Sequence, residues 1–95
     1  MTTPEAYSAY RQGLVGSPAF RAQEMAKCLN EQKRLTPELR QAAATLLNIP
    51  VEKFADVICE RSINGIVSGR IDYEAYKKIQ AKKLDAEIVK VFQGR

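Results

Sequence analysis

The fold is decided by residues 36–69, which read TPELRQAAATLLNIPVEKFADVICERSINGIVSG. Many of the long aliphatic side chains of the protein fall here, and nearly all of them recur at three- and four-residue spacing, the period of a helix with one apolar face. Leu39 and Leu46 belong to the apolar stripe of the first half. We expect Leu46, Phe54 and Ile58 to be buried together, because their stripes belong to adjacent helices joined by a tight turn. The rest of the chain should pack against this core.

Three Ser/Thr-Pro pairs predict where helices begin. A serine or threonine side chain can accept a hydrogen bond from a free N–H group of the first turn, and proline fits the first helical position. The pairs are Thr3-Pro4, Ser17-Pro18 and Thr36-Pro37. They predict helices over residues 4–14 and 18–32, and a third from residue 37 that Asn48 and Pro50 end.

The next segment can form one helix that Gly69 ends, or two short helices. Its apolar residues keep helical spacing through residues 51–67. Asn64 and Gly65 weaken a helix interior, glycine by about 1 kcal/mol. We therefore predict an interruption within residues 60–65.

Asp72 can cap a last helix, which we expect over residues 73–92. The apolar stripe of this helix changes phase, because Leu84 and Ile88 share one face and Ile79 points nearly opposite. Two arrangements explain the change. Either the first turns face the core and the last turns cover a different surface, or the helix protrudes and its C-terminal stripe meets a partner such as a second copy.

Length and composition predict one compact all-α domain over residues 1–95, a bundle of four to six helices with short loops. An apolar content of 45% is normal for a globular protein. The sequence has no apolar run long enough to cross a membrane and no basic and then apolar leader at its start. We therefore expect no membrane partner and a cytoplasmic location.

The sequence excludes several classes of catalytic and metal site. It contains no histidine and two cysteines, so catalysis by histidine is excluded and a zinc site is not expected. Cys28 and Cys59 lie on predicted helix faces, and we interpret them as reduced thiols that line the core. A disulfide or a reactive thiol is the less favoured alternative. We expect no enzyme activity, no metal and no cofactor.

Basic residues gather in the last third of the chain. The net charge is +4, and residues 70–95 hold seven basic and four acidic residues. The basic face of the last predicted helix consists of Lys77, Lys78, Ile79, Lys82 and Lys83. Such a face could follow DNA phosphates, or it could dock on an acidic protein surface with Ile79 as an apolar anchor. A solvated lysine face is an equally common interpretation.

A second candidate site lies in the middle of the chain. Residues 58–79 read ICERSINGIVSGRIDYEAYKKI and contain Ser62-Ile63, Ile66 and Gly69-Arg70, followed by a capped helix. In this order they resemble the C-terminal half of lambda-repressor-like helix-turn-helix domains, and the resemblance extends over residues 39–79. The turn segment of this chain is about two residues shorter than in that family.

This resemblance implies a tight turn near residues 59–61 and a recognition helix that enters a DNA groove. Ser62 and Asn64 would then face bases, and Arg61 and Arg70 would reach phosphates. The alternative is an amphipathic helix with a glycine C-cap, followed by a further capped helix.

These patterns lead to a functional hypothesis and an alternative. The hypothesis is a small cytoplasmic binding protein, a DNA-binding regulator or accessory factor that uses the basic C-terminal third. The alternative is a protein–protein interaction module, an adaptor or a small inhibitor of a larger complex, which docks on an acidic protein surface through the same basic helix. A homodimer through the C-terminal helix is a further option.

Overall fold

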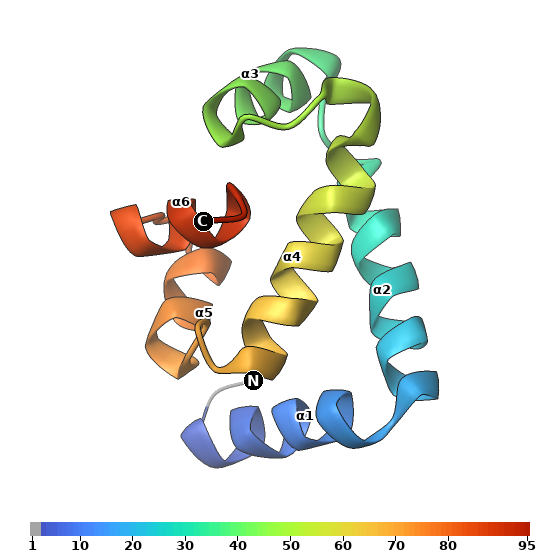
Figure 1. Ribbon diagram of the computed structural model, residues 1–95, viewed down its shortest axis with the longest axis vertical. Coiled ribbons are helices and arrows are strands. Elements are labelled where there is room, and N and C mark those ends of the chain that lie inside the picture. Colours follow the sequence, from blue (N-terminus) through green and yellow to red (C-terminus); the bar gives the residue numbers. More distant parts are fainter. Residues whose placement is uncertain (1–2) are drawn as a thin grey trace.

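The computed structural model describes residues 3–95, and its regular elements over that range are all helices, which confirms the all-α prediction (Figure 1). Its elements are α1 (Pro4–Gly16), α2 (Pro18–Gln32), α3 (Pro37–Leu47), the short 3-10 helix η1 (Val51–Lys53), α4 (Phe54–Ser68), α5 (Tyr73–Gln80) and α6 (Ala86–Phe92). None of the described helices is long and apolar enough to span a bilayer.

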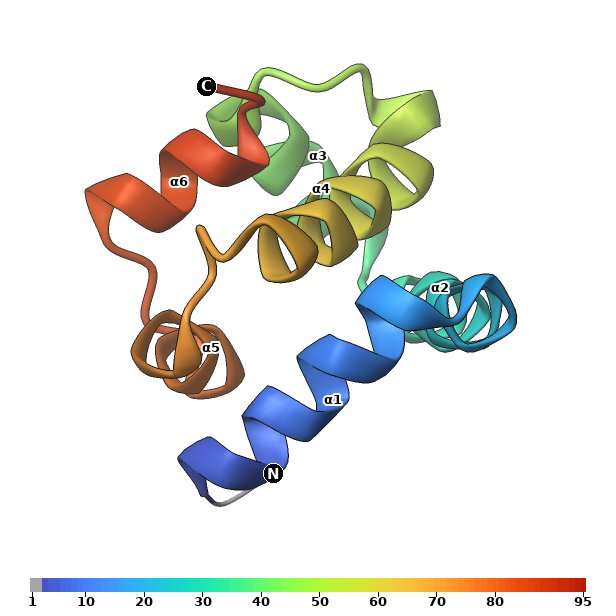
Figure 2. The same ribbon diagram turned by 60° about the horizontal axis from the view of Figure 1, so that its bottom comes forward.

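Helix α4 occupies the centre of the arrangement. In two views it lies between α2 on one side and the α5–α6 pair on the other, while α1 crosses one end of the molecule and α3 the opposite end (Figures 1 and 2). Helices α1, α2 and α6 all contact α4. Residues 36–69 therefore supply the helix on which α1, α2 and α6 pack.

The three predicted helix starts are confirmed, and the reason is side-chain capping. Thr3, Ser17 and Thr36 each accept a hydrogen bond from the backbone N–H three residues later, at 3.1, 3.1 and 3.2 Å. Helix α2 has the predicted bounds. Helix α1 continues to Gly16 instead of residue 14, because the Ser17 N–H donates to the Gly13 carbonyl and closes one more turn.

The predicted interruption within residues 60–65 is wrong, since α4 is continuous through Gly65. Gly65 allows Ile71 to approach the helix backbone closely. Ile71, which is 1% exposed, packs directly on the helix backbone there, and its N–H donates to the Gly65 carbonyl at 2.9 Å. A β-carbon at position 65 would lie 2.6 Å from Ile71 Cδ1 and 3.1 Å from Val91 Cγ1. The tight turn expected near residues 59–61 is absent, so Ser62 and Asn64 stand in the middle of a helix.

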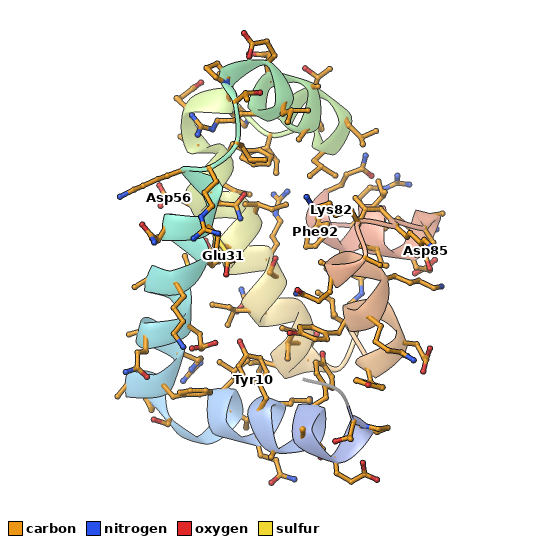
Figure 3. The ribbon with its side chains drawn as sticks, turned by 180° about the vertical axis from the view of Figure 1, so that it is seen from behind. Tyr10, Glu31, Asp56, Lys82, Asp85 and Phe92 are labelled. Carbon is orange, nitrogen blue, oxygen red and sulfur yellow. A yellow bond between two sulfur atoms is a disulfide. The ribbon has the colours of Figure 1, made fainter. Side chains whose placement is uncertain are left out.

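The single last helix predicted over residues 73–92 is also wrong, because the chain turns between α5 and α6. Asp85 accepts a hydrogen bond from the Ile88 N–H and begins a new helix, and Lys82 adopts a left-handed backbone conformation with φ 59° (Figure 3). The turn explains the change of apolar phase. Helix α6 buries Ile88 and Phe92, and α5 packs Ile79 against the same core.

The predicted burial of Leu46 beside Phe54 and Ile58 is wrong. Leu39 and Leu46 are both 59% exposed, whereas Ala44 and Leu47 are the buried side chains of α3. The reason is that α3 crosses one end of the molecule, where η1 is its main neighbouring element. One face of α3 is therefore covered, and the stripe that contains the two leucines is left outside.

Cys28 and Cys59 form a disulfide that joins α2 to α4, so the prediction of two reduced thiols is wrong. The helices bring the two Cα atoms to 5.8 Å, within the range that a disulfide requires. The bond matters for α2 in particular, because no residue of α2 is fully buried. Its attachment rests on partly buried side chains such as Met25 and Leu29 and on the covalent link.

Replacement of Gly65 by alanine should destabilise the protein, although alanine is the better helix former. The added methyl group meets Ile71 and Val91 at distances that force both to move, and overpacking of this kind outweighs a propensity gain of about 1 kcal/mol. We expect a net loss of about 1–2 kcal/mol in urea denaturation. Gly16→Ala is the matched control, since a β-carbon there meets no atom within 4 Å. Equal stability of the two variants would contradict the close contact.

Loss of the disulfide should lower the free energy of unfolding by about 3–4 kcal/mol, because the bond closes a loop with a sequence separation of 31. Cys28→Ser tests this by denaturation under oxidising conditions. Wild-type protein in excess dithiothreitol should show the same shift, and the reductant should leave the variant unaffected. A wild-type midpoint that does not respond to the reductant would show that the two thiols are not joined.

Candidate functional site

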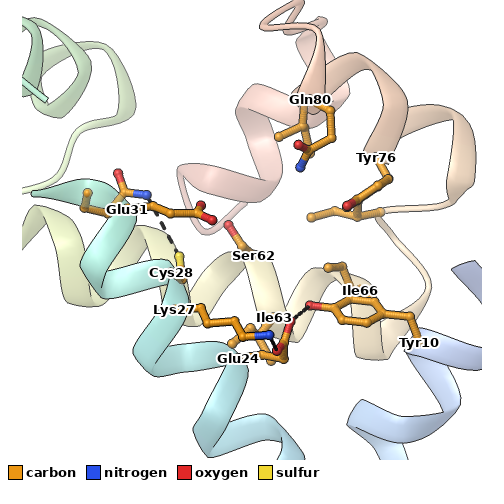
Figure 4. A pocket seen from close by; sticks show the side chains of 13 residues that line it. Tyr10, Glu24, Lys27, Cys28, Glu31, Ser62, Ile63, Ile66, Tyr76 and Gln80 are labelled. Atoms are coloured by element: carbon orange, nitrogen blue, oxygen red, sulfur yellow. Dashed lines mark hydrogen bonds and ion pairs between the residues drawn. The ribbon is translucent and has the colours of Figure 1, made fainter. Parts of the chain in front are cut away.

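A cavity of about 290 Å³ lies between α2, α4 and α5, with the side chain of Tyr10 from α1 at one end (Figure 4). A hollow lined by apolar side chains and a few convergent polar groups is the usual form of a ligand site, and this one lies near the lower end of the usual size range. We refer to it as the α2–α5 cavity.

One wall of the cavity is acidic. Glu24 and Glu31 lie seven residues apart on α2, which places them two turns apart on one face. The Glu24 side chain is only 13% exposed and accepts a hydrogen bond of 2.8 Å from the Tyr10 hydroxyl. Its Oε2 atom lies 3.0 Å from Lys27 Nζ, in an ion pair without hydrogen-bond geometry. Glu31 has no ion-pair partner among the described residues.

The opposite wall comes from α5 and presents Tyr76, Ile79 and Gln80. In Figure 4 the hydroxyl of Tyr76 and the amide of Gln80 point toward the hollow from the side that faces Glu31. The pKa of Tyr76 is raised, first by burial and then by the charges of Glu31 and Glu24. Burial and the hydrogen bond with Glu24 likewise raise the pKa of Tyr10. Both phenols are therefore held neutral beside carboxylates.

The floor of the cavity is mainly apolar and comes from α4 and the loop after it. Ile63, Ile66 and Ile71 line it, together with Ser62, whose hydroxyl donates to the Ile58 carbonyl within the helix. The lining carries two carboxylates and one ammonium group. An environment with this balance favours a cation that carries an apolar stem and disfavours a phosphate.

The structure brings together some of the residues selected from the sequence, but not as one basic site. Ser62 and Ile79 line the α2–α5 cavity. Arg61, Asn64 and Arg70 line a different surface hollow, between α4 and the end of α6. Arg61 has a structural role there, because its Nη1 atom donates a hydrogen bond of 2.7 Å to the Phe92 carbonyl at the C-terminus of α6.

The predicted lysine face does not form, because the turn after α5 separates its members. Lys77 pairs with Glu74 at 3.1 Å and lies over the ring of Tyr73. Lys78 pairs with Asp85 at 2.8 Å, and this hydrogen bond raises the pKa of the lysine. Lys82 and Lys83 lie in the turn itself. Lys77 and Lys78 are thus paired with nearby carboxylates, and Lys82 and Lys83 lie outside the helix.

Glu24 and Glu31 were not among the candidate residues predicted from the sequence. The available signal was the spacing of Glu24, Cys28 and Glu31, which places them on one face of α2. That spacing does not reveal which helix lies opposite. The cavity became visible only once α5 was placed across from α2.

Within residues 3–95, no three His, Cys, Asp or Glu side chains gather in a way that could hold a metal ion. The polar groups of the cavity lining include the carboxylates and phenols described above. Comparison of the chain with protein-family models, curated proteins and solved structures found no match.

Proposed function

We propose that this protein is a non-catalytic binding module that takes an organic cation into the α2–α5 cavity. The ligand is an ammonium or guanidinium group on an apolar stem, as in a lysine or arginine side chain presented by a partner protein. The observation that carries the proposal is the combination of Glu24 and Glu31 with two neutral phenols over an isoleucine floor.

Each part of the lining has a defined role in this proposal. The cation lies between Glu31, which forms no ion pair among residues 3–95, and the ring of Tyr76, since aromatic faces attract cations. The methylene stem lies on Ile63 and Ile66, where its burial contributes about 0.8 kcal/mol per CH₂ group. Lys27 neutralises Glu24, so Glu31 supplies most of the charge selectivity.

The proposal changes the expected partner. The sequence favoured DNA or an acidic protein surface because of the lysines in residues 70–95. In the structure, three of the four acidic residues in that segment form ion pairs with lysines. The α2–α5 cavity, in contrast, has an excess of negative charge. A basic ligand fits it better than an acidic one.

Glu31→Gln should weaken the binding of N-acetyl-lysine methylamide by about threefold to fivefold, because an exposed ion pair contributes up to about 1 kcal/mol. Amide chemical shifts of residues in the cavity lining would report the titration. The norleucine analogue keeps the stem and lacks the charge, so it should bind the wild type more weakly than the lysine derivative does. Its affinity for the wild type and for the Glu31→Gln variant should be equal.

Glu52→Gln is the matched control, since Glu52 lies in η1, outside the cavity lining, and the charge change is the same. A peptide that contains one lysine should bind more tightly than the free amino-acid derivative if the natural ligand is a protein. Comparable affinities would favour a free organic amine. Equal weakening by Glu31→Gln and Glu52→Gln would place the binding outside the cavity.

Charge-driven binding of duplex DNA is the second candidate, favoured by cations that have no ion-pair partner among the described residues. These are Arg70, Lys82, Lys83 and Arg95 in the C-terminal third. Replacement of Lys82 and Lys83 by glutamine should then lower DNA affinity at low salt and flatten the dependence of affinity on salt. Lys77→Gln is the control, because Lys77 is already paired with Glu74. An unchanged salt slope in the double variant would contradict DNA binding at this turn.

A further inference from the structure

Helix α3 presents an apolar surface that nothing in the described chain covers. Leu39 and Leu46 are each 59% exposed and lie seven residues, or about 10.5 Å, apart along the same side of the helix. Ala42, also exposed, lies between them. In Figure 1 this helix crosses one end of the molecule. None of its residues lines the α2–α5 cavity. We refer to Leu39, Ala42 and Leu46 as the α3 stripe.

Helix α3 itself carries few charges around the stripe. Helix α3 contains two charged residues, Glu38 and Arg40. Arg40 is directed toward α2, where its Nη2 atom donates to the Gln32 carbonyl at 3.2 Å. The uncharged exposed neighbours of the stripe are Gln41 and Thr45. The centres of protein interfaces show the same depletion of charge.

Opposite charges lie at the two ends of the stripe. Glu38 is exposed in the first turn of α3. At the other end, Gln93 Nε2 donates to the Leu46 carbonyl at 3.0 Å, and Arg95 Nη1 donates to Gln93 Oε1 at 3.2 Å. The side chain of Arg95 is thereby held near the C-terminal end of α3. One end of the surface is negative and the other is positive.

From this pattern we propose that the α3 stripe binds a second copy of the same chain, with the two α3 helices antiparallel about a two-fold axis. In that arrangement Leu39 of each copy packs on Leu46 of the other, and the two Ala42 residues meet at the axis. Glu38 of each copy faces Arg95 of the other. The surface is thus complementary to itself in shape and in charge, as an interface with two-fold symmetry requires.

The alternatives fit the observations less well. A parallel pair would place Glu38 against Glu38 and Arg95 against Arg95, and like charges at an interface oppose association. Nucleic acid would meet an apolar surface with no row of cations. The contact spans only two helical turns and is smaller than a standard stable interface, so the dimer is reversible at micromolar concentrations.

Analytical ultracentrifugation over a range of micromolar concentrations tests the proposal. The wild type should shift from monomer to dimer, and the double variant Leu39→Gln and Leu46→Gln should weaken dimerisation at least about tenfold. Both side chains are exposed, so the variant should keep the circular dichroism spectrum of the wild type. Val15→Gln, at a half-exposed valine of α1, is the matched control and should still dimerise. A wild type that stays monomeric, or leucine variants that dimerise normally, would overturn the proposal.

Charge exchange tests the antiparallel orientation. Glu38→Arg alone and Arg95→Glu alone should each weaken self-association about threefold at low salt, because each change places like charges together twice per dimer. The double variant Glu38→Arg and Arg95→Glu should recover. A mixture of the two single variants should form the mixed dimer in preference to either homodimer, since both of its end contacts are then attractive. Failure of the double variant to recover would rule out this orientation.

Discussion

The packing of Ile71 on the backbone of α4 at Gly65 is the contact on which the arrangement of the chain depends. It allows the segment after Gly69 to turn back along α4, and it brings Val91 of α6 against the same point. The Tyr7 hydroxyl of α1 donates a hydrogen bond to the Ile71 carbonyl. Helices α1 and α6 thus both meet α4 close to this buried isoleucine.

The C-terminal end of α4 is completed by α1 in the same region. The last carbonyls of a helix lack partners within the helix, and buried ones require donors from elsewhere. Arg11 supplies them, since its Nε atom donates to the Ile66 carbonyl at 3.0 Å and its Nη2 atom to the Val67 carbonyl at 2.8 Å. The basic residue of α1 therefore has a structural role, and the two helices are joined by polar contacts as well as by packing.

Local signals in the sequence predicted the helix starts, because a capping side chain and its N–H partner lie three residues apart. Contacts between distant residues could not be predicted in that way. Gly65 weakens a helix when only its neighbours are considered, but Ile71 requires it. Asp85 lies among residues that favour a helix, so the sequence did not mark it as a cap. Its capping role became clear only because the structure has a turn before α6. The helical spacing of Leu39 and Leu46 does not reveal which side of α3 the rest of the protein covers.

The candidate site was harder to predict than the fold for a related reason. A count of charges along the sequence shows an excess of lysine in the last third, whereas the charge that a ligand meets depends on which residues pair. Lys77 and Lys90 lie three residues after glutamates on their own helices, and Lys78 reaches Asp85 across the turn. The glutamates of α2 are far from these lysines in sequence, yet they line the cavity whose other wall is α5.

The disulfide connects this cavity to the stability of the fold. Cys28 lies between Glu24 and Glu31 on the face of α2 that forms the acidic wall, and its partner Cys59 is completely buried in α4. Helix α2 has no fully buried residue of its own, so the covalent link fixes the wall near its midpoint. The position of the α2 carboxylates relative to α4 is therefore held in part by this bond. The acidic wall thus stands on a helix that is held to α4 by partly buried side chains and by this covalent bond.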